Sequence, residues 1–306
     1  MLIPSLLLIY SCEEIVDIDI EKKERRLVIN GVLYPDSLIK LDISRSLSVL
    51  EDVDSNYWLT PDVVLLQDGH GREVPLSETR KGHYASQERA VAGGQYSLKV
   101  GKEGYPTVTA KTHVPTRPEV LDLDTTRLTD QWGWASMQCQ MTLNDPPAQN
   151  YYIIRTYSLH YWVDSTGTVG AVQVDTLTDK GPFYAYPSVS MGEEELWDTY
   201  GLIFEDATFN GQQYTYMFEF DAWNIDYADT VLVELQSLTP GLYKYLRSRS
   251  QANESKDNPL SQPVQVYSNI NNGLGIFGGA CPVEYALAGN TQLEWKKAIK
   301  PAKSRK

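Results

Sequence analysis

Two short stretches of the chain have residue spacings that enzymes use for chemistry. Residues 273–278 (Gly-Leu-Gly-Ile-Phe-Gly) match the glycine pattern of a dinucleotide-binding loop, and Ser37 and Lys40 have the serine–lysine spacing of penicillin-recognising enzymes. A dinucleotide loop needs a strand before it, a helix after it and a βαβ unit, whereas Cys281 and Pro282 follow this pattern close to the C-terminus. Ser37 and Lys40 fall on a predicted strand without the motifs that accompany this spacing in those enzymes. We therefore predict no cofactor and no catalytic residues.

Residues of metal-binding types are scattered along the chain. None of the four histidines has the helical His-Glu-x-x-His spacing of zinc hydrolases, and the chain has no Cys-x-x-Cys pair. The histidines are His70, His83, His113 and His160. The carboxylates at positions 219, 221, 226 and 229 could offer oxygen ligands to calcium, but their spacing is not that of an EF-hand. Because solvated loop carboxylates are commoner, the sequence predicts no metal site.

One cysteine has a context that predicts a covalent modification. Cys12 follows the apolar run Leu2–Tyr10 and Ser11, and two glutamates come directly after it. The run is too short to cross a bilayer as a helix, which takes roughly 20 apolar residues, but it has the length of a signal-peptide h-region. We therefore predict that residues 1–11 are a lipoprotein-type signal peptide, that a peptidase cuts before Cys12, and that its thiol becomes a thioether to diacylglycerol.

Residues 12–26 are charged and lack a clear apolar period, which favours a lipidated tether. Buried acyl chains contribute about 0.8 kcal/mol per methylene, so two or more chains on Cys12 would hold the protein to a membrane almost permanently. The alternative is a buried N-terminal strand with an incidental cysteine. The basic residues that usually precede an h-region are missing after Met1, so we expect the natural chain to start upstream.

The composition limits the classes of partner. A formal net charge of −13 over 306 residues argues against nucleic acid and against adhesion to anionic lipid. Hydrophobic residues make up 42% of the chain, and its 20 tyrosines and 7 tryptophans favour β-structure and contact surfaces. Besides Cys12 only Cys139 and Cys281 remain, too few for a disulfide scaffold. A disulfide between them is one possibility, and two buried thiols are the favoured one.

The first half of the chain predicts a β-sandwich over residues 27–115. Short segments with strand-like patterns recur between turn signals such as Pro35-Asp36. The expected strands cover residues 27–33, 38–44, 62–67, 82–84, 93–100 and 107–114. Regular spacing of this kind indicates a sandwich, and the strands around Tyr84 and Tyr96 resemble Ig-like modules of the transthyretin or fibronectin type. Two prolines within the run 115–118 mark the domain boundary.

Residues 116–290 predict a second antiparallel β-domain, either a sandwich or a barrel-like fold, with one short α-helix. The expected strands cover residues 136–143, 151–163, 172–177, 214–220, 230–238, 263–268 and 276–280. We also expect a hairpin turn at Asn210-Gly211 and a single helical turn at residues 193–197. Thr239 as a cap and Pro240 at the first helical position predict a helix that ends around Gln251. Residues 291–306 are expected to be a frayed basic tail.

The long aromatic strand provides the best candidates for ligand or partner contact. These are Tyr151, Tyr157, Tyr161 and Trp162. Aromatic side chains give a large contact area at interfaces, and they could stack on sugars or peptides. About half of the residues on one strand must face inward, so core packing is the competing and favoured interpretation.

The run from Pro263 to Gly278 resembles the C-terminal hallmark of a known family. Its sequence, Pro-Val-Gln-Val-Tyr-Ser-Asn-Ile-Asn-Asn-Gly-Leu-Gly-Ile-Phe-Gly, is similar to that of the domain-of-unknown-function 4249 lipoproteins of Bacteroidota. Residues 27–33, 82–100 and 202–211 agree as well, and the chain departs from the family pattern after Ala280. The acidic residues after Cys12 also resemble the surface-export signal of Bacteroidota lipoproteins. The resemblance implies an outer-membrane lipoprotein, often encoded beside a TonB-dependent transporter.

Within this hallmark run we predict structural roles. The residues concerned are Asn269, Gly273, Gly275, Phe277 and Gly278. Glycines permit positive φ and close approach of the backbone. Ile276 and Phe277 between them would then plug one end of a sandwich or barrel.

Taken together, the sequence predicts a lipid-anchored outer-membrane protein exposed on the cell surface, with the periplasmic face as the second placement. It would bind a ligand or partner without catalysis, as an accessory of a TonB-dependent transporter in nutrient capture. Two alternatives stay open. One is a surface hydrolase of glycan or peptide, and the other is a structural or adhesion lipoprotein.

Overall fold

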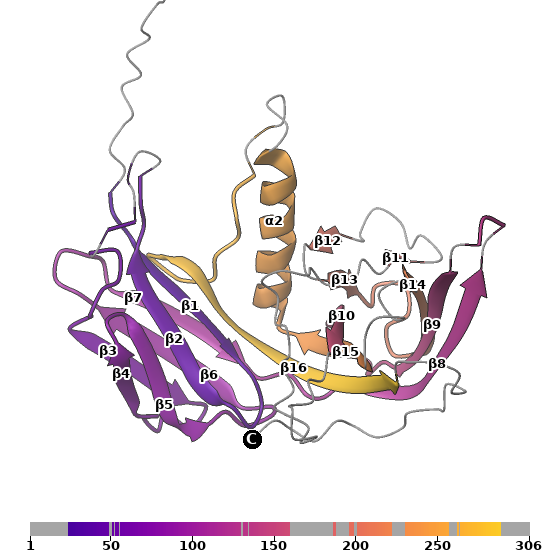
Figure 1. The fold of residues 1–306 in the computed structure, drawn as a ribbon. Helices are drawn as coiled ribbons and strands as arrows, with labels where there is room; N and C mark the ends of the chain where they lie inside the picture. Colours follow the sequence, from indigo (N-terminus) through magenta and orange to yellow (C-terminus); the bar gives the residue numbers. More distant parts are fainter. Residues whose placement is uncertain are drawn as a thin grey trace, which may run out of the picture.

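The computed structural model describes residues 24–48, 51, 53–54, 56–129, 131–133, 135–159, 186–187, 196–198, 201–221, 230–256, 262 and 264–288. Cys12, the predicted signal peptide and the basic tail lie outside these residues. Within them the chain forms sixteen strands and one α-helix, so the mainly β fold is as predicted (Figure 1). Among the described residues, no helix is both long enough and apolar enough to span a membrane.

The N-terminal module is a sandwich of two sheets. One sheet contains β1 (Leu27–Leu33), β2 (Leu38–Arg45), β5 (His83–Arg89) and β4 (Leu76–Arg80), and the other contains β3 (Val63–Asp68), β6 (Gln95–Gly101) and β7 (Val108–His113). Burial alternates along β1, which places Leu27, Ile29 and Leu33 fully inside the core between the sheets. The predicted sandwich is therefore confirmed. Strand β4 was not predicted from the sequence, because its residues are mostly polar and four of its five residues are exposed.

The second module also stacks two sheets, which is the sandwich form of the prediction. Its four-stranded sheet has the order β11 (Tyr186–Pro187), β14 (Gln213–Asp221), β9 (Ala135–Asn144) and β8 (Glu119–Thr129). The facing strands are β12 (Leu196–Asp198), β13 (Gly201–Glu205), β10 (Tyr151–Leu159) and β15 (Thr230–Leu238). Aromatic rings fill the core between them, and Phe204 stacks on Tyr216 with their centroids 4.7 Å apart. The helical turn expected at residues 193–197 is wrong, because Leu196 and Trp197 pair with β13 as a strand.

One long strand, β16 (Leu274–Ala288), joins the two modules into a single nine-stranded sheet (Figure 1). Its first half runs parallel to β1, with Leu33 opposite Gly279, and its second half runs antiparallel to β15, with Leu238 opposite Ala280. The strand continues past Pro282, which lies beyond the last residue paired with β1. The sheet therefore crosses the boundary that the sequence places at residues 115 and 116.

The glycine-rich run lets β16 approach its neighbours closely. Gly275 has φ of +102°, and a Cβ at this position would lie 2.1 Å from the carbonyl oxygen of Ile29. The Asn269 side chain clamps Phe277: its Nδ2 donates to the Phe277 carbonyl (2.8 Å) and its Oδ1 accepts from the Phe277 N–H (2.9 Å). Phe277 is fully buried in the core of the N-terminal module, whereas Ile276 packs in the core beneath the helix. The run thus supplies side chains to two cores.

The helix α2 (Pro240–Lys256) begins at the predicted residue and runs past Gln251. Its residues Leu242, Tyr243 and Leu246 pack against the nine-stranded sheet. The Thr239 hydroxyl, where we expected a cap, accepts the N–H of Gly279 (3.1 Å) and so ties the start of the helix to β16.

The strand predicted at residues 263–268 does not form over the described residues 264–268. The N–H of Tyr267 donates instead to the hydroxyl of Ser248 on α2 (2.8 Å). Alternation of Val264, Val266 and Ser268 resembled a strand, but this backbone lies along the helix and lacks a strand partner within the described residues.

The cysteines Cys139 and Cys281 are both buried and free, so they do not form the disulfide that the sequence left open. Burial raises the pKa of each thiol. Both therefore remain protonated at neutral pH and behave as small apolar side chains.

Candidate functional site

A cavity of about 430 Å³ lies where the two modules meet, and we name it the junction pocket. Three segments form it: the linker from β7 to β8, the turn from β9 to β10, and the turn from β15 to α2. Its lining residues are Gly93, residues 113–119, Asn144, Pro146, residues 149–152, Ser237, Leu238 and Pro240. The volume falls within the range of roughly 300–1,000 Å³ that small-molecule sites occupy.

The junction pocket lies at the end of the N-terminal module farthest from where the chain enters it. Strand β1 begins at Leu27 and ends at Leu33, which lies opposite Gly279. Gly279 touches the backbone of His113, since a Cβ at Gly279 would lie 2.0 Å from the His113 carbonyl oxygen. His113 in turn begins the linker that lines the pocket. The length of β1, about 20 Å, therefore separates the entry point of the chain from the pocket.

The linker wall of the pocket is stiff. The N–H of Val114 donates to the Gly94 carbonyl, and the N–H of Gly93 donates to the Val114 carbonyl, both at 2.9 Å. Pro115 and Pro118 are buried and fix their own φ angles. The exposed residues Thr116 and Arg117 lie between these prolines. The fold thus presents them to solvent from a backbone with little freedom.

The polar groups around the pocket are mixed in character. Arg117 supplies a cation, and the carboxylate of Glu119 accepts a hydrogen bond from Asn144 Nδ2 (2.6 Å). Partial burial lowers the pKa of His113, so its imidazole is neutral at pH 7 and can both donate and accept. Gln149 adds an exposed amide at the rim. Such a lining suits a ligand with several hydrogen-bonding groups, such as a sugar or a segment of peptide.

Two buried aspartates hold the β9–β10 wall of the pocket from behind. Asp145 accepts hydrogen bonds from the Tyr152 hydroxyl (2.5 Å) and the Gly211 N–H (2.9 Å). Asp206 accepts from the backbone N–H of Asn150 (2.7 Å) and from its side-chain amide (3.1 Å). Asn150 and Tyr152 line the pocket, whereas the two carboxyl groups do not. The aspartates therefore position the wall and would not touch a ligand in the pocket.

The carboxyl group of Asp145 also acts electrostatically on that of Asp206. Burial raises the pKa of Asp206, the hydrogen bonds from Asn150 lower it, and the neighbouring carboxyl of Asp145 raises it again. Burial raises the pKa of Tyr152 as well, and its hydrogen bond to Asp145 adds to that increase. The Tyr152 hydroxyl is therefore a permanent donor at physiological pH.

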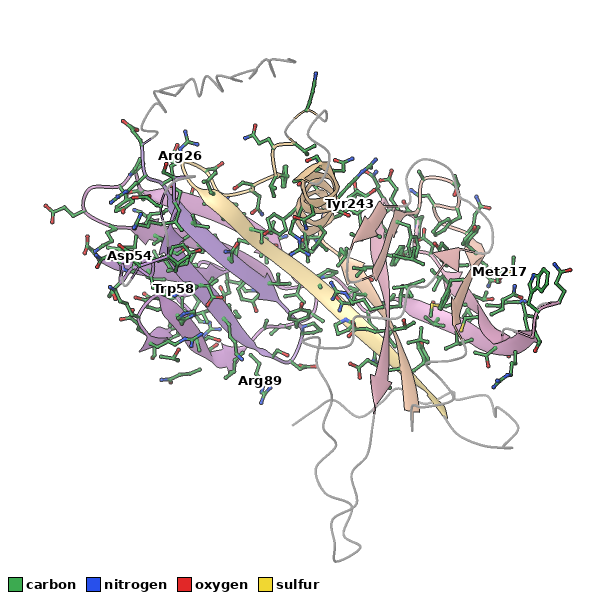
Figure 2. All side chains as sticks on the ribbon, turned by 45° about the horizontal axis from the view of Figure 1, so that its top comes forward. Arg26, Asp54, Trp58, Arg89, Met217 and Tyr243 are labelled. Atoms are coloured by element: carbon green, nitrogen blue, oxygen red, sulfur yellow. The ribbon has the colours of Figure 1, made fainter. Side chains whose placement is uncertain are left out.

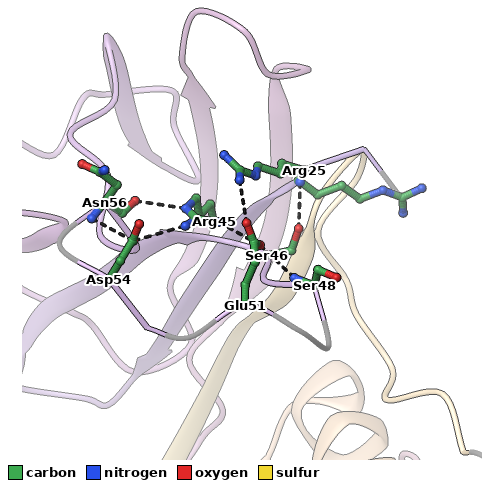
Figure 3. Close-up of polar contacts among 8 residues, drawn as sticks. Arg25, Arg45, Ser46, Ser48, Glu51, Asp54 and Asn56 are labelled. Carbon is green, nitrogen blue, oxygen red and sulfur yellow. Dashed lines mark hydrogen bonds and ion pairs between the residues drawn. The ribbon is translucent and has the colours of Figure 1, made fainter. Parts of the chain in front are cut away.

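A second polar cluster lies at the opposite end of the N-terminal module (Figure 3). The almost buried side chain of Arg45 forms ion pairs with Glu51 and Asp54, both at 3.2 Å, and Glu51 also pairs with Arg25 at 2.6 Å. A hydrogen bond from the backbone of Ser48, followed by the two arginines, lowers the pKa of Glu51 to about 2. Each charged group of this cluster meets an opposite charge, so the cluster is well suited to fixing the start of β1.

A further cavity of about 460 Å³ adjoins the junction pocket at Gly93, which lines both. Arg72 and Glu88 face it and form a two-pronged ion pair with both distances at 2.8 Å, and Asp68 pairs with Arg72 at 3.0 Å. These charges satisfy one another. In Figure 2, Arg89 lies toward this end of the module and Arg26 and Asp54 lie toward the other.

The structure places one of the predicted contact aromatics inside the protein. Tyr151 is 7% exposed, and its ring packs 4.4 Å from that of Tyr243 on α2, although its edge reaches the junction pocket. Core packing, the favoured interpretation, therefore describes most of the Tyr151 ring, and contact of its edge with a ligand stays a prediction. The side chain of Tyr157, and all of Tyr161 and Trp162, lie outside the described residues.

The sequence does not predict the residues that build the pocket. His113 lacks the spacing of a zinc site, Arg117 lies between the two prolines of the domain boundary, and no pattern marks Asp145. The available signal was the pair of prolines around Arg117, because a stiff exposed cation beside a domain boundary is a common element of binding sites. Nothing in the sequence places Asp145 beside Asp206. Within the described residues, no group of three or more His, Cys, Asp or Glu side chains is placed to hold a metal ion.

Comparison with known proteins gives a family and little else. A family model described as "Domain of unknown function (DUF4249)" matches residues 13–285. No curated protein matches the chain. Among solved structures, the crystal structure of bovine butyrophilin matches with 12% sequence identity over 70% of this chain and 92% of that chain, at a TM-score of 0.21. A likeness that weak carries no argument about this protein.

Proposed function

The chain belongs to the DUF4249 family, a domain of unknown function, and from that premise we propose that it is a binding protein that uses the junction pocket while a lipid on Cys12 holds it to the outer membrane. The partner would be a TonB-dependent transporter, and the role would be nutrient capture without catalysis by this chain. The observation that carries the proposal is the position of a ligand-sized pocket at the end of the module opposite the start of β1, which the predicted tether precedes in the chain.

This position suits a protein that reaches away from a membrane. Among the described residues, Arg25 and Arg26 are the first that bond to the sandwich, through Glu51 and Ser46. The tether of about 13 residues from Cys12 could extend at most about 45 Å, and β1 adds about 20 Å. Lipid on Cys12 would therefore leave the pocket facing outward, within reach of a large membrane protein or of solutes outside the cell.

The walls of the pocket come from both modules, and β16 holds them in place. The linker wall follows β7 of the N-terminal module, and the other walls follow β9 and β15 of the second module. Because the nine-stranded sheet is continuous through β16, the walls do not need to assemble when a ligand arrives. A preformed site loses less entropy on binding, which favours affinity.

Site-specific photocrosslinking in intact cells tests the binding proposal. A photoreactive amino acid at Gln149, on the pocket rim, is compared with one at the exposed Glu103, at the tether-facing end of the N-terminal module. We expect the Gln149 variant to crosslink to one discrete outer-membrane protein or ligand and the Glu103 variant not to do so. Recovery of uncrosslinked protein from both variants would refute the proposal.

Metabolic labelling tests the anchor separately. The natural full-length chain and its Cys12→Ser variant are expressed in cells fed an alkyne fatty acid. We expect label and membrane sedimentation for the first and neither for the second, because the thiol is the acceptor of the lipid. Protease digestion of intact cells then distinguishes the outer surface from the periplasmic face. A Cys12→Ser protein that still sediments with membranes would exclude lipid as the anchor.

A further inference from the structure

Two buried carboxyl groups lie in adjoining turns of the second module, and each accepts a hydrogen bond from a backbone N–H of the turn that carries the other. Asp206 has no exposed surface and Asp145 is 4% exposed. Asp145 lies in the turn that follows β9, and Asp206 lies directly after β13, so the pair connects two turns that are distant in sequence. Hydrogen-bond donors reach both oxygens of Asp145 but only Oδ2 of Asp206. Within the described residues, Oδ1 of Asp206 has no hydrogen-bond partner.

The groups around the two aspartates are either neutral or negatively charged. Tyr152 donates to Asp145, and Asn150 donates to Asp206. Tyr151 lies within electrostatic reach of both Asp206 and Glu205. None of the ion pairs formed among the described residues includes either aspartate. Two neighbouring carboxylates without a counter-ion cannot both stay charged in a buried site, because each destabilises the other's ionised form.

We infer that the Asp206 carboxyl carries a proton that it donates to Asp145, and that this shared proton acts as a latch that holds the β9–β10 wall of the junction pocket in place. The functional meaning of the latch depends on the proposed role of that pocket, but the shared proton does not. With the proton present, one carboxyl donates to the other, so the oxygen of Asp206 that lacks a donor gains a partner. The latch then ties the turn at residues 145–150 to the turn at residues 206–211.

Loss of the proton would loosen the wall. Two like charges would then lie close together in a buried site. Moving the two turns apart would relieve their repulsion. Separation breaks the bonds from the Asn150 N–H to Asp206 and from the Gly211 N–H to Asp145. Asn150 and Tyr152 line the pocket, so its shape would change with them. Binding in the pocket would therefore respond to pH through residues that do not touch the ligand.

The direction of the pH effect follows from the sign of the shift. Burial and Asp145 raise the pKa of Asp206 in the folded chain above its unfolded value. Between these two values the folded chain holds a proton that the unfolded chain has lost, so the free energy of unfolding falls as pH rises. Above the raised value the curve is flat again. The latch is closed on the acid side of that window and open on the alkaline side.

Carbon-13 NMR of aspartate carboxyl groups in the full chain tests the shared proton directly. We expect one aspartate resonance of the wild type to titrate above the ordinary value of about 3.9. That resonance should disappear in Asp206→Asn, which mimics the protonated form, and persist in Asp124→Asn, which removes an exposed carboxyl from the same module. Ordinary titration of every aspartate in the wild type would overturn the latch, and this outcome needs no variant to fold.

Amide hydrogen exchange tests the wall. After correction for intrinsic exchange rates, the N–H groups of Asn150 and Gly211 should lose protection at least tenfold in the wild type as pH rises through the window. Their protection should change little in Asp206→Asn. Identical profiles in the two proteins would overturn the latch. No ligand is present in either experiment, so a failed latch together with a successful Gln149 crosslink would remove the latch and leave the proposed function standing.

Discussion

The Arg45 cluster and the Asp145–Asp206 pair are two places where this chain buries ionisable groups. The two places differ in how the charge is compensated. Arg45 is surrounded by Glu51 and Asp54, so each charge finds a partner of opposite sign. The two aspartates instead lie in adjoining turns without a counter-ion, and their donors are neutral hydroxyl and amide groups. A buried charge with a counter-charge fixes structure over a wide pH range, whereas a like-charged pair needs a proton and therefore responds to pH.

The two arrangements also differ in what they hold. The Arg45 cluster fixes the start of β1, the first strand of the described chain. The aspartate pair holds one wall of the junction pocket, at the other end of the β1–β16 pairing. Rigidity at the start of β1 and adjustability at the pocket are the combination expected of the anchored binding protein proposed above.

The largest effect should come from breaking the nine-stranded sheet that connects the two modules. We expect Gly275→Ala to destabilise the folded chain by about 4 kcal/mol or more, since the new Cβ would collide with the carbonyl oxygen of Ile29. Gly104→Ala is the matched control, because Gly104 has a similar positive φ of +81° but open space around it, and it should cost only about 1–2 kcal/mol. Denaturant unfolding followed by tryptophan fluorescence measures both. Equal losses in the two variants would show that β16 does not lock the modules together.

A smaller effect is expected when the aspartate pair loses a donor. Tyr152→Phe removes the hydroxyl bonded to Asp145 and should lower the free energy of unfolding by about 1–3 kcal/mol. Tyr105→Phe serves as the control, because the Tyr105 hydroxyl makes no hydrogen bond within the described residues. Without its donor the pair should hold its proton more tightly, so the titration of Asp206 should move to still higher pH. A titration that moves to lower pH would contradict the shared proton.

The pH dependence of stability distinguishes the two clusters by sign. The lowered pKa of Glu51, about 2, contributes stability that is fully present above its unfolded value near 4.5 and is lost as pH falls toward 2. Asp206 contributes in the reverse direction, losing stability as pH rises. We therefore measure the thermal unfolding midpoint against pH from pH 2 to pH 9. In Glu51→Gln the decrease of the midpoint toward low pH should become smaller, and in Asp206→Asn the decrease with rising pH should become smaller. Flattening on the same side in both variants would remove the contrast.

The smallest effect is expected at the edge of the Arg45 cluster. The Arg25 side chain is 57% exposed, and its ion pair with Glu51 is screened by water and salt. Arg25→Ala should therefore leave the thermal midpoint nearly unchanged, and any difference from the wild type should disappear at high salt. Arg45→Met in the same assay should show a clear loss, because it leaves two carboxylates without their buried partner. A loss in Arg25→Ala as large as that in Arg45→Met would show that the outer pair is structural.

The sequence determined the local structure of this protein. Alternation at Leu27, Ile29 and Leu33 indicates one buried strand face. Thr239 and Pro240 indicate where the helix begins. Both signals can be read from the sequence because burial patterns and turn chemistry involve only a few neighbouring residues. The same short-range signals gave a wrong prediction at residues 264–268. There the backbone N–H of Tyr267 donates to Ser248 on the helix instead of to a neighbouring strand.

Only the tertiary structure decided which distant segments meet. The parallel pairing of β16 with β1, the wall shared by the β7–β8 linker and the β9–β10 turn, and the meeting of Asp145 with Asp206 all join residues far apart in the chain. Such contacts depend on how whole sheets stack, and local residue patterns do not encode that stacking. The residues of the pocket and of the latch are therefore ordinary in the sequence, and they gain a chemical role from their neighbours in the fold.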